Sequence, residues 1–581
     1  MTEDTLSFPL SLSQEGMWLA IQITPESAAY NIPYLLSLTG PVNKEIFART
    51  LGDIIERHES LRTTFVFQDG EVAQIVSESL PLPYGEHDFR ETPDPLAAAH
   101  QFALQEARRL FDLATGPLLR VWLLQLADEK YQLLCVFHHL ISDGWSMDVF
   151  LRELSEIYTA YHQGQPQTLQ PLPIHYADFA VWQRERLQGP IRQKLLDHWQ
   201  QALADAPPLL ALASDHPRPS IPSLNGATHI LELPHLLAER LIAVAQSEQC
   251  TLFMALLAVF QATLFRSTEQ TDLIVGSPLA NRTLAEVQGQ IGLFTNMLPL
   301  RTKIEPELSW RQLLKQVRDT TLETYAHQEL PFEELVKAIH PIRIPGASPC
   351  FQIAFSLQQS DQETLRLPGL LIKTLDLHNN TSKFDLTMNM KLTPEHFSAT
   401  FIYSTDLFEA PTIQRLADHM QLVLEQILAQ PDVQLAALPA LVQISSSVQP
   451  EPPIERTEQP EENGVPLALQ RTLEQMLVEI WQQVLGVSEL EVQDNFFDLG
   501  GYSLLMIQVQ RQLQDLLHVQ IALTDLFRSP TVQTMAHFLI HGFPEVPALL
   551  QQRERGRARD EALSQQRARR QAQRAQRGAR S

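Results

Sequence analysis

Residues 131–146, YQLLCVFHHLISDGWS, place a strand pattern, two histidines and a turn in direct succession. The first seven residues are mostly apolar or β-branched, which predicts a buried strand. His138 and His139 follow at once, and a Ser-Asp-Gly turn then leads into a helical pattern. A strand fixes the backbone of the histidines at its end, and Gly144 permits a conformation or a close ligand approach that a Cβ atom would block. The stretch therefore predicts a platform for a reactive side chain.

The two histidines are not equally suited to be the reactive side chain. Neighbouring strand residues point to opposite faces, so at most one of His138 and His139 faces a given cavity, and the other is structural. A single histidine at a strand end is more often structural than catalytic. Asp143, four residues after His139, either orients an imidazole or pairs with a distant arginine. The local pattern does not separate these two roles.

The string HHLISDGWS resembles the HHxxxDG signature of the condensation domains of non-ribosomal peptide synthetases, a family related to chloramphenicol acetyltransferase. Other blocks of that family follow in the family's order: LSLSQEGMW (10–18), RHESLRTTF (57–65), YADFAVW (176–182), IGLFTNMLPLR (291–301), HQELPFEEL (327–335) and, more loosely, RIPGASPCFQIAF (343–355). The resemblance covers about residues 5–445, and we assign residues 1–445 to this domain. It implies an α/β fold of two acetyltransferase-like lobes set in a V, divided near residues 175–225.

The resemblance also implies roles for the motif residues. As a neutral imidazole, His139 would take the proton of the attacking ammonium or hydrogen-bond the amine and the tetrahedral intermediate. Gly144 would supply backbone room and an amide donor beside the nucleophile. His138 and Asp143 fit scaffolding roles better. In the family the arginine of the LRT triplet, here Arg62, forms a buried salt bridge to this aspartate, so Asp143 is expected to be ionised and structural.

Two further positions depend on the same resemblance. Asn296 lies in a block close to the substrate tunnel of the family, where it would donate a hydrogen bond to a thioester or pantetheine group, or else stabilise a turn. Gly16 stands where the first block often has arginine, which weakens a finer assignment of subtype.

The composition changes after residue 445. Residues 446–466 are rich in proline, serine and acidic residues, which predicts a linker. Residues 467–545 show short helical patterns and the string FFDLGGYSLL, which resembles the phosphopantetheine attachment site of peptidyl carrier proteins. This resemblance implies a small all-α, four-helix carrier domain with 4'-phosphopantetheine on Ser503. A serine at a helix N-terminus suits the phosphodiester, because the helix dipole and free amides favour an anion there.

Composition limits the remaining classes of function. A formal net charge of −24 over 581 residues argues against nucleic-acid binding and is typical of a soluble cytosolic protein. The three cysteines are too far apart for a metal knuckle or a redox pair, and we expect no metal site. An acidic N-terminus and the lack of an 18-residue apolar run predict a cytoplasmic protein without a membrane span. The basic tail, 546–581, is either a disordered segment or a docking segment for the next synthase in the series, although basic tails also bind nucleic acid or anionic membranes.

Together the two resemblances imply an acyltransferase that joins a donor acyl or peptidyl thioester to an acceptor aminoacyl thioester. The donor would arrive on an upstream carrier protein. Only a linker separates the two domains, so an adenylation enzyme acting in trans must charge Ser503 after a phosphopantetheinyl transferase has modified it. Two alternatives stay open: an ester-forming or other acyltransferase, and a non-catalytic carrier and docking module. The acyl group and the amino acid are not specified by these motifs.

Overall fold

The computed structural model describes residues 5–68, 71–358, 365–393, 396–441, 467–496, 499, 503–522, 525–526 and 529–551. The chain forms two compact units, residues 1–451 and residues 452–581. The predicted linker, 446–466, and most of the predicted tail lie outside the described residues.

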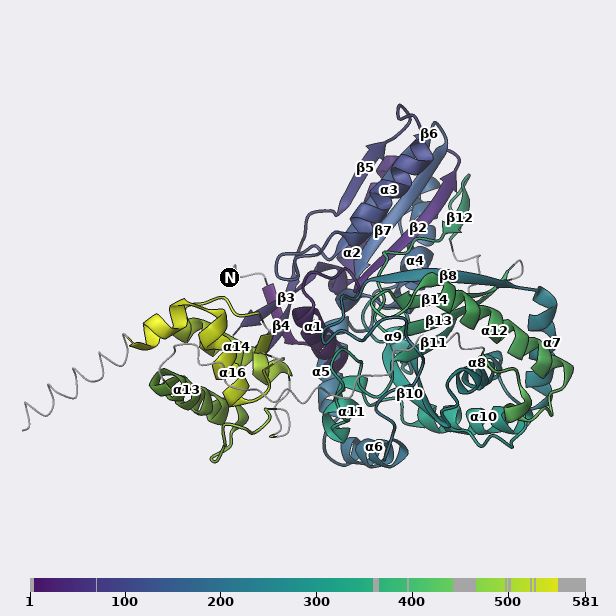
Figure 1. The fold of residues 1–581 in the computed structure, drawn as a ribbon. Helices are drawn as coiled ribbons and strands as arrows, with labels where there is room; N and C mark the ends of the chain where they lie inside the picture. The colour runs from purple at the N-terminus through teal and green to yellow at the C-terminus, as the bar shows by residue number, and fades with distance from the viewer. Residues whose placement is uncertain are drawn as a thin grey trace, which may run out of the picture. The chain divides into compact units, whose positions relative to one another are not determined.

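The N-terminal lobe of the first unit is built on a five-stranded sheet, in the order β12-β2-β7-β6-β5 (Figure 1). Its strands are β2 (Asn31–Thr39), β5 (Tyr84–Asp88), β6 (Leu119–Ala127), β7 (Lys130–His138) and β12 (Leu371–Leu375). All neighbours are antiparallel except β5 and β6. Every residue of β7 after Lys130 is buried, because the strand is central and covered on both faces. This explains its continuous apolar sequence.

Helices and a small second sheet complete this lobe. The helices are α1 (Leu12–Ile23), α2 (Lys44–Arg57), α3 (Pro95–Arg108) and α4 (Gly144–His162). The second sheet has the order β1-β4-β3, formed by β1 (Thr5–Pro9), β3 (Thr63–Gln68) and β4 (Glu71–Ser77). The short 3-10 turns η1 (Glu59–Arg62) and η2 (His139–Ile141) follow α2 and β7. Two helices, α5 (Tyr176–Arg186) and α6 (Gly189–Ala202), then lead to the second lobe.

The C-terminal lobe has a six-stranded mixed sheet, in the order β10-β9-β11-β13-β14-β8. Its strands are β8 (Gly226–Leu233), β9 (Asp272–Leu279), β10 (Asn296–Lys303), β11 (Ile353–Gln358), β13 (Leu386–Leu392) and β14 (Phe397–Ser404). The remaining helices of the lobe are α7 (His235–Ser247), α8 (Leu252–Thr268), α9 (Ala285–Gln288), α10 (Trp310–Ala326), α11 (Phe332–Ile339) and α12 (Ala410–Ala429). The predicted fold class, two α/β lobes, is confirmed.

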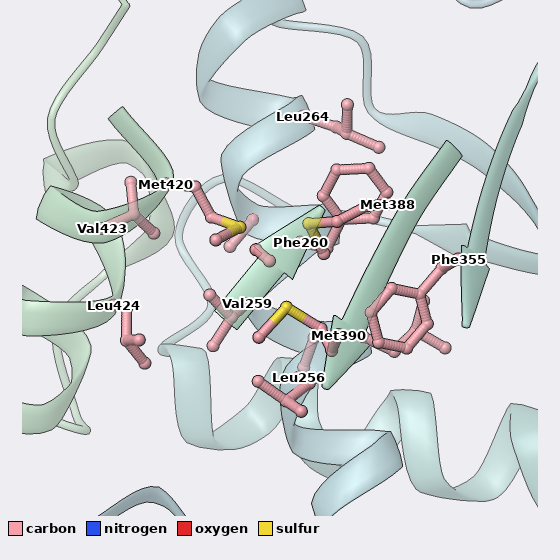
Figure 2. Packing of buried hydrophobic residues seen from close by; sticks show 14 of the residues in the cluster. Leu256, Val259, Phe260, Leu264, Phe355, Met388, Met390, Met420, Val423 and Leu424 are labelled. Carbon is pink, nitrogen blue, oxygen red and sulfur yellow. The ribbon is translucent and has the colours of Figure 1, made fainter. Parts of the chain in front are cut away.

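Helix α8 is the centre of the second lobe's core. It is apolar around its whole circumference, which is typical of a fully buried helix. Figure 2 shows Val259 and Phe260 of α8 between Met388 and Met390 of β13 and the apolar face of α12. In the described part of the chain no single helix has the length and apolarity to cross a membrane, and α7 and α8 pass this test only as a pair bent by 106°.

One strand crosses between the lobes. The strand β12 comes from the C-terminal half of the chain, yet it pairs with β2 of the N-terminal lobe, from Leu371 opposite Thr39 to Leu375 opposite Leu35. Just after it, Asn379 Nδ2 donates hydrogen bonds to the carbonyl oxygens of Ala28 (2.9 Å) and Asn31 (3.1 Å). This crossover brings the segment that leads into β13 beside the end of β7, because Asn31 pairs with His138.

The second unit is helical, as predicted. Its described helices include α13 (Leu467–Leu485), α14 (Ser503–Leu517) and α16 (Val532–Gly542), and α13 contacts both others. Trp481 is fully buried, and its ring lies 4.8 Å from that of Phe496. Leu473, Leu477, Met506 and Met535 complete this small core.

Candidate active site

His139 sits where β7 ends and the turn η2 begins. Its backbone N–H donates to the Tyr30 carbonyl oxygen at 2.9 Å. Its ring Nδ1 lies 2.9 Å from the Ser142 carbonyl oxygen. Because a carbonyl only accepts, Nδ1 must carry the proton, and Nε2 keeps its lone pair. The residue is only partly buried, and Nε2 is the ring nitrogen that can accept a hydrogen bond or a proton.

The environment keeps both histidines neutral at pH 7. Burial, followed by the charge of Lys383, lowers the pKa of His139 to about 3. Burial also lowers the pKa of His138 to about 3. His138 Nδ1 accepts a hydrogen bond from the Leu140 N–H at 3.2 Å, and its ring packs edge-on against Phe111 at 5.8 Å. His138 thus caps the turn that presents His139.

We expect the free energy of unfolding to fall as the pH drops below about 6.5. Unfolded histidines take up a proton near that pH, whereas His138 and His139 stay neutral in the fold down to about pH 3. The unfolded state therefore binds more protons in this window, and stability is lost as the pH falls through it. Urea unfolding of the full chain from pH 7.5 to 4 measures the slope.

Substituting one histidine separates its contribution to the pH dependence of the unfolding free energy from that of the carboxylates, which also titrate in this range. His138→Asn should flatten the slope, while His396→Asn, at an exposed position outside the site, should leave it as it is. Equal slopes for the wild type and His138→Asn would show that His138 binds a proton equally in both states.

Asp143 is the N-cap of α4 and its side chain is fully buried. Its Oδ1 accepts from the Ser146 N–H (2.8 Å) and from Arg282 Nη2 (3.0 Å). Its Oδ2 accepts from the backbone N–H groups of Phe294 (3.0 Å) and Thr295 (3.2 Å). The carboxylate is therefore saturated by partners, which suits a structural anion.

The partner of Asp143 is Arg282, and the predicted salt bridge to Arg62 was wrong. Arg62 ends η1 and turns back onto α2, where its guanidinium donates to the carbonyl oxygens of Ile55 and Glu56, both at 3.2 Å, and to that of Ser77 on β4. The Ile55 and Glu56 carbonyls belong to the last turn of α2, where carbonyl groups lack intrahelical donors. Arg62 thus supports the end of α2 and its junction with β4.

Arg282 comes from the C-terminal lobe, just after β9. Beyond Asp143, its Nη1 donates to the carbonyl oxygens of Val287 (2.7 Å) and Gln290 (2.6 Å), and its guanidinium lies 4.1 Å from the centre of the Phe294 ring. Sequence reasoning missed this residue. The sequence did hold one indication of its role. Arg282 is the only basic residue in the mostly apolar and uncharged stretch between the end of β9 and Arg301.

The same contacts attach residues 291–295 of the second lobe to the first. Ser146 Oγ donates to the Gly292 carbonyl oxygen (2.9 Å) and lies 3.0 Å from the Gly292 N–H. Ser60 Oγ donates to the Ile291 carbonyl oxygen (2.7 Å). Asp143 is the N-cap of α4, and Ser146 is the third residue of the helix. The Asp143 carboxylate therefore joins the His139 loop to both lobes.

The remaining predicted positions differ in what they offer a ligand. Asn296 Nδ2 donates to the carbonyl oxygens of Gln328 (2.9 Å) and Leu330 (2.8 Å), and its Oδ1 accepts from the Phe332 N–H (3.0 Å). These contacts engage both its donors, so the geometry favours the turn-stabilising role. Gly144 is exposed at the first position of α4, and an added Cβ would meet no atom within 4 Å. Space beside it is open.

Ser503, the predicted attachment residue, lies at the first position of α14. Residues 500–502 of its motif lie outside the described residues. The N–H groups of a first helical turn have no intrahelical acceptors, so a phosphodiester on Ser503 would meet free donors and the positive end of the helix dipole. This helix start fits the expected 4'-phosphopantetheine group. Across the described residues, no three histidine, cysteine or acidic side chains cluster in a way that could hold a metal ion.

Comparison with known proteins places this geometry in a family. Residues 6–445 match the model of the condensation domain, and residues 475–539 match that of the phosphopantetheine attachment site. Phosphinothricin tripeptide synthetase PhsC of Streptomyces viridochromogenes is 39% identical over 446 residues, covering 76% of this chain and 41% of that protein. Chondramide synthase cmdD of Chondromyces crocatus is 36% identical over 435 residues, covering 74% of this chain and 11% of that protein. The chain thus spans less than half the length of these relatives.

Solved structures show the same fold. The X-domain from teicoplanin biosynthesis is 25% identical, with a TM-score of 0.67 over 74% of this chain and 97% of that one. The condensation domain from the Monacolin K polyketide synthase MokA is 22% identical, with a TM-score of 0.66 over 75% of this chain and 100% of that one.

Proposed function

The chain belongs to the condensation domain family of non-ribosomal peptide synthetases and carries a phosphopantetheine attachment domain, and on this premise we propose that it forms an amide bond between two carrier-bound thioesters. The observation that carries the proposal is the His139 ring: its Nδ1 lies against the Ser142 carbonyl oxygen, so the lone pair of Nε2 remains for a substrate proton, and the residue is only partly buried.

In the proposed reaction the acceptor amine attacks the carbonyl carbon of the donor thioester. A C–N bond forms, and His139 Nε2 accepts a hydrogen bond from the amine and then its proton. The carbonyl re-forms, the C–S bond breaks, and the proton leaves with the donor sulfur. Gly144 leaves room beside the reacting atoms, and the Asp143–Arg282 pair holds the His139 loop in place. Holding two tethered reactants in this geometry supplies a large part of the rate.

We assign the acceptor to the chain's own carrier unit. The phosphopantetheine group would be attached at Ser503 by a phosphopantetheinyl transferase, and it supplies a thiol that holds the amino acid as a thioester. Residues 446–474 alone separate the two family matches, too few for an adenylation domain, so an adenylation enzyme acting in trans would supply the amino acid. The donor would arrive on an upstream carrier. The basic tail would bind the next synthase in the series, and the setting would be the cytoplasm.

The test begins with loading. Incubation of the full chain with coenzyme A and a phosphopantetheinyl transferase is expected to raise its intact mass by one phosphopantetheinyl group, and Ser503→Ala is expected to show no increase. Ser529→Ala, at a buried serine elsewhere in the same unit, is the control and should still be loaded. Loading of the Ser503→Ala chain would refute the assignment of the attachment site.

Amide formation is tested with loaded carriers. A wild-type chain loaded with an aminoacyl group and mixed with an acylated donor carrier should gain the donor acyl group by mass. Replacing the amino acid by the matching hydroxy acid separates amide formation from general acyl transfer. A chain that gains no acyl group from any loaded donor carrier would support a carrier and docking role instead.

A further inference from the structure

Lys383 is a cation in the interior of the condensation unit, next to His139. Its Nζ lies 5.0 Å from the centre of the Tyr30 ring, and the Tyr30 carbonyl oxygen is the acceptor of the His139 N–H at 2.9 Å. The segment that carries Lys383 is held there by the two hydrogen bonds of Asn379 to Ala28 and Asn31. These contacts place Lys383 against Tyr30, the residue whose carbonyl oxygen holds the His139 backbone.

The Lys383 ammonium has no counter-ion within the described residues. None of their hydrogen bonds or ion pairs includes it, and Asp385, two residues further on, is engaged by Arg218 Nη1 at 2.8 Å. Burial alone lowers the pKa of Lys383 to about 8. Burial and then the charge of Glu333 raise the pKa of Tyr30 to about 12, so Tyr30 is neutral. The titratable groups around Lys383 and Tyr30 include His138, His139 and Glu333 and, on the segment of Lys383 itself, His378 and Asp385.

An unpaired ammonium is unfavourable inside a protein, because it loses hydration and gains only a weak attraction to an aromatic face. Its side chain is partly open to space, as is that of His139. Its charge is also the strongest charge effect on the His139 ring. Lys383 packs against Tyr30, and the Tyr30 carbonyl oxygen holds His139, so the two side chains are close enough for the charge of one to act on the other. The cation lacks a negative partner among the described residues.

We propose that Lys383 is a further catalytic residue, whose ammonium donates a hydrogen bond to the carbonyl oxygen of the donor thioester as that oxygen becomes anionic. This inference rests on the proposed function. When the amine lone pair forms the C–N bond, the π electrons of the carbonyl move to its oxygen, and Lys383 stabilises the resulting oxyanion while keeping its own proton. When the C=O bond re-forms, the C–S bond breaks, and the sulfur leaves with the electron pair and the proton that His139 took from the amine.

Lys383→Met, Lys383→Arg and Lys373→Met test the assignment in a single-turnover assay with loaded carriers. Lys373 lies on β12, is exposed and serves as the matched control. We expect Lys383→Met to lower the rate about 100-fold, the effect of losing one oxyanion donor. Its melting temperature should be unchanged or higher, because a buried charge is removed. Lys383→Arg should recover part of the rate, and Lys373→Met should keep all of it.

The pH profile gives a second readout. The wild-type rate should decline above about pH 8 as Lys383 loses its proton, and this decline should be absent in Lys383→Arg, because arginine stays charged.

Full activity of Lys383→Met would overturn the inference, and if His139→Ala is inactive in the same assay the proposed function still stands. A lowered melting temperature of Lys383→Met, with no recovery in Lys383→Arg, would also overturn it by showing a structural role. Full activity of His139→Ala would overturn the proposed function itself.

Discussion

His139→Ala is expected to lower the rate of amide formation by about 100-fold or more, which is the usual effect of losing a general base. The substitution removes Nε2 and, among the described residues, breaks only the side-chain hydrogen bond from Nδ1 to the Ser142 carbonyl oxygen. Carrier loading at Ser503 and the melting temperature should therefore stay close to wild type. The single-turnover assay with two loaded carriers measures the rate.

The low pKa of His139 affects the expected pH dependence of the rate. With a pKa of about 3 the resting imidazole is neutral but weakly basic, so the acceptor amine must bind in its neutral form or donate its proton late. Negative charge on the carbonyl oxygen would offset the Lys383 charge and make His139 more basic as the reaction advances. The wild-type rate should accordingly show no acidic limb near pH 6.5 from His139. His327→Ala, at a histidine stacked on His198 away from this loop, is the control and should retain full activity.

Among the substitutions proposed, Arg282→Ala is expected to be the most destabilising. It should lower the free energy of unfolding by about 3–5 kcal/mol, because removing one member of a buried ion pair leaves the other charge uncompensated. The Asp143 carboxylate would keep its backbone donors but lose its cation. The carbonyl oxygens of Val287 and Gln290 would lose their donor as well. Urea unfolding of the full chain measures the difference.

A double-mutant cycle separates the observed pair from the one that the family resemblance implied. Asp143→Asn combined with Arg282→Ala should show strong coupling. Asp143→Asn combined with Arg62→Ala should be additive, because the hydrogen bonds of Arg62 to the described residues all go to backbone carbonyls on α2 and at the end of β4. Strong coupling between positions 62 and 143 would contradict the structure at this point.

Local features of the site could be predicted from the sequence. The strand predicted at 131–137 is β7 (Lys130–His138), and the helical pattern predicted after the turn is α4, which Asp143 caps. The residues that decide these elements lie within a few positions of one another, so local sequence patterns are enough to predict the strand, the turn and the helix.

The contacts that hold the site could not be predicted in this way. Arg282 reaches Asp143 across 139 positions of sequence, and Lys383 reaches Tyr30 across more than 350. Both depend on how the lobes pair, which local periodicity does not encode. The resemblance supplied a partner for Asp143, yet it transferred that role to Arg62, where the end of α2 offers nearer acceptors.

The crossover of β12 has a consequence for folding and for chain engineering. Until residues 371–375 have been synthesised, the β2 edge of the N-terminal sheet is open, and an unpaired edge invites pairing with other chains. A fragment that ends with the first lobe would keep that edge exposed. An exchange of lobes between relatives would therefore have to move residues 371–383 together with the N-terminal lobe, since this one segment both closes the sheet and brings Lys383 to Tyr30.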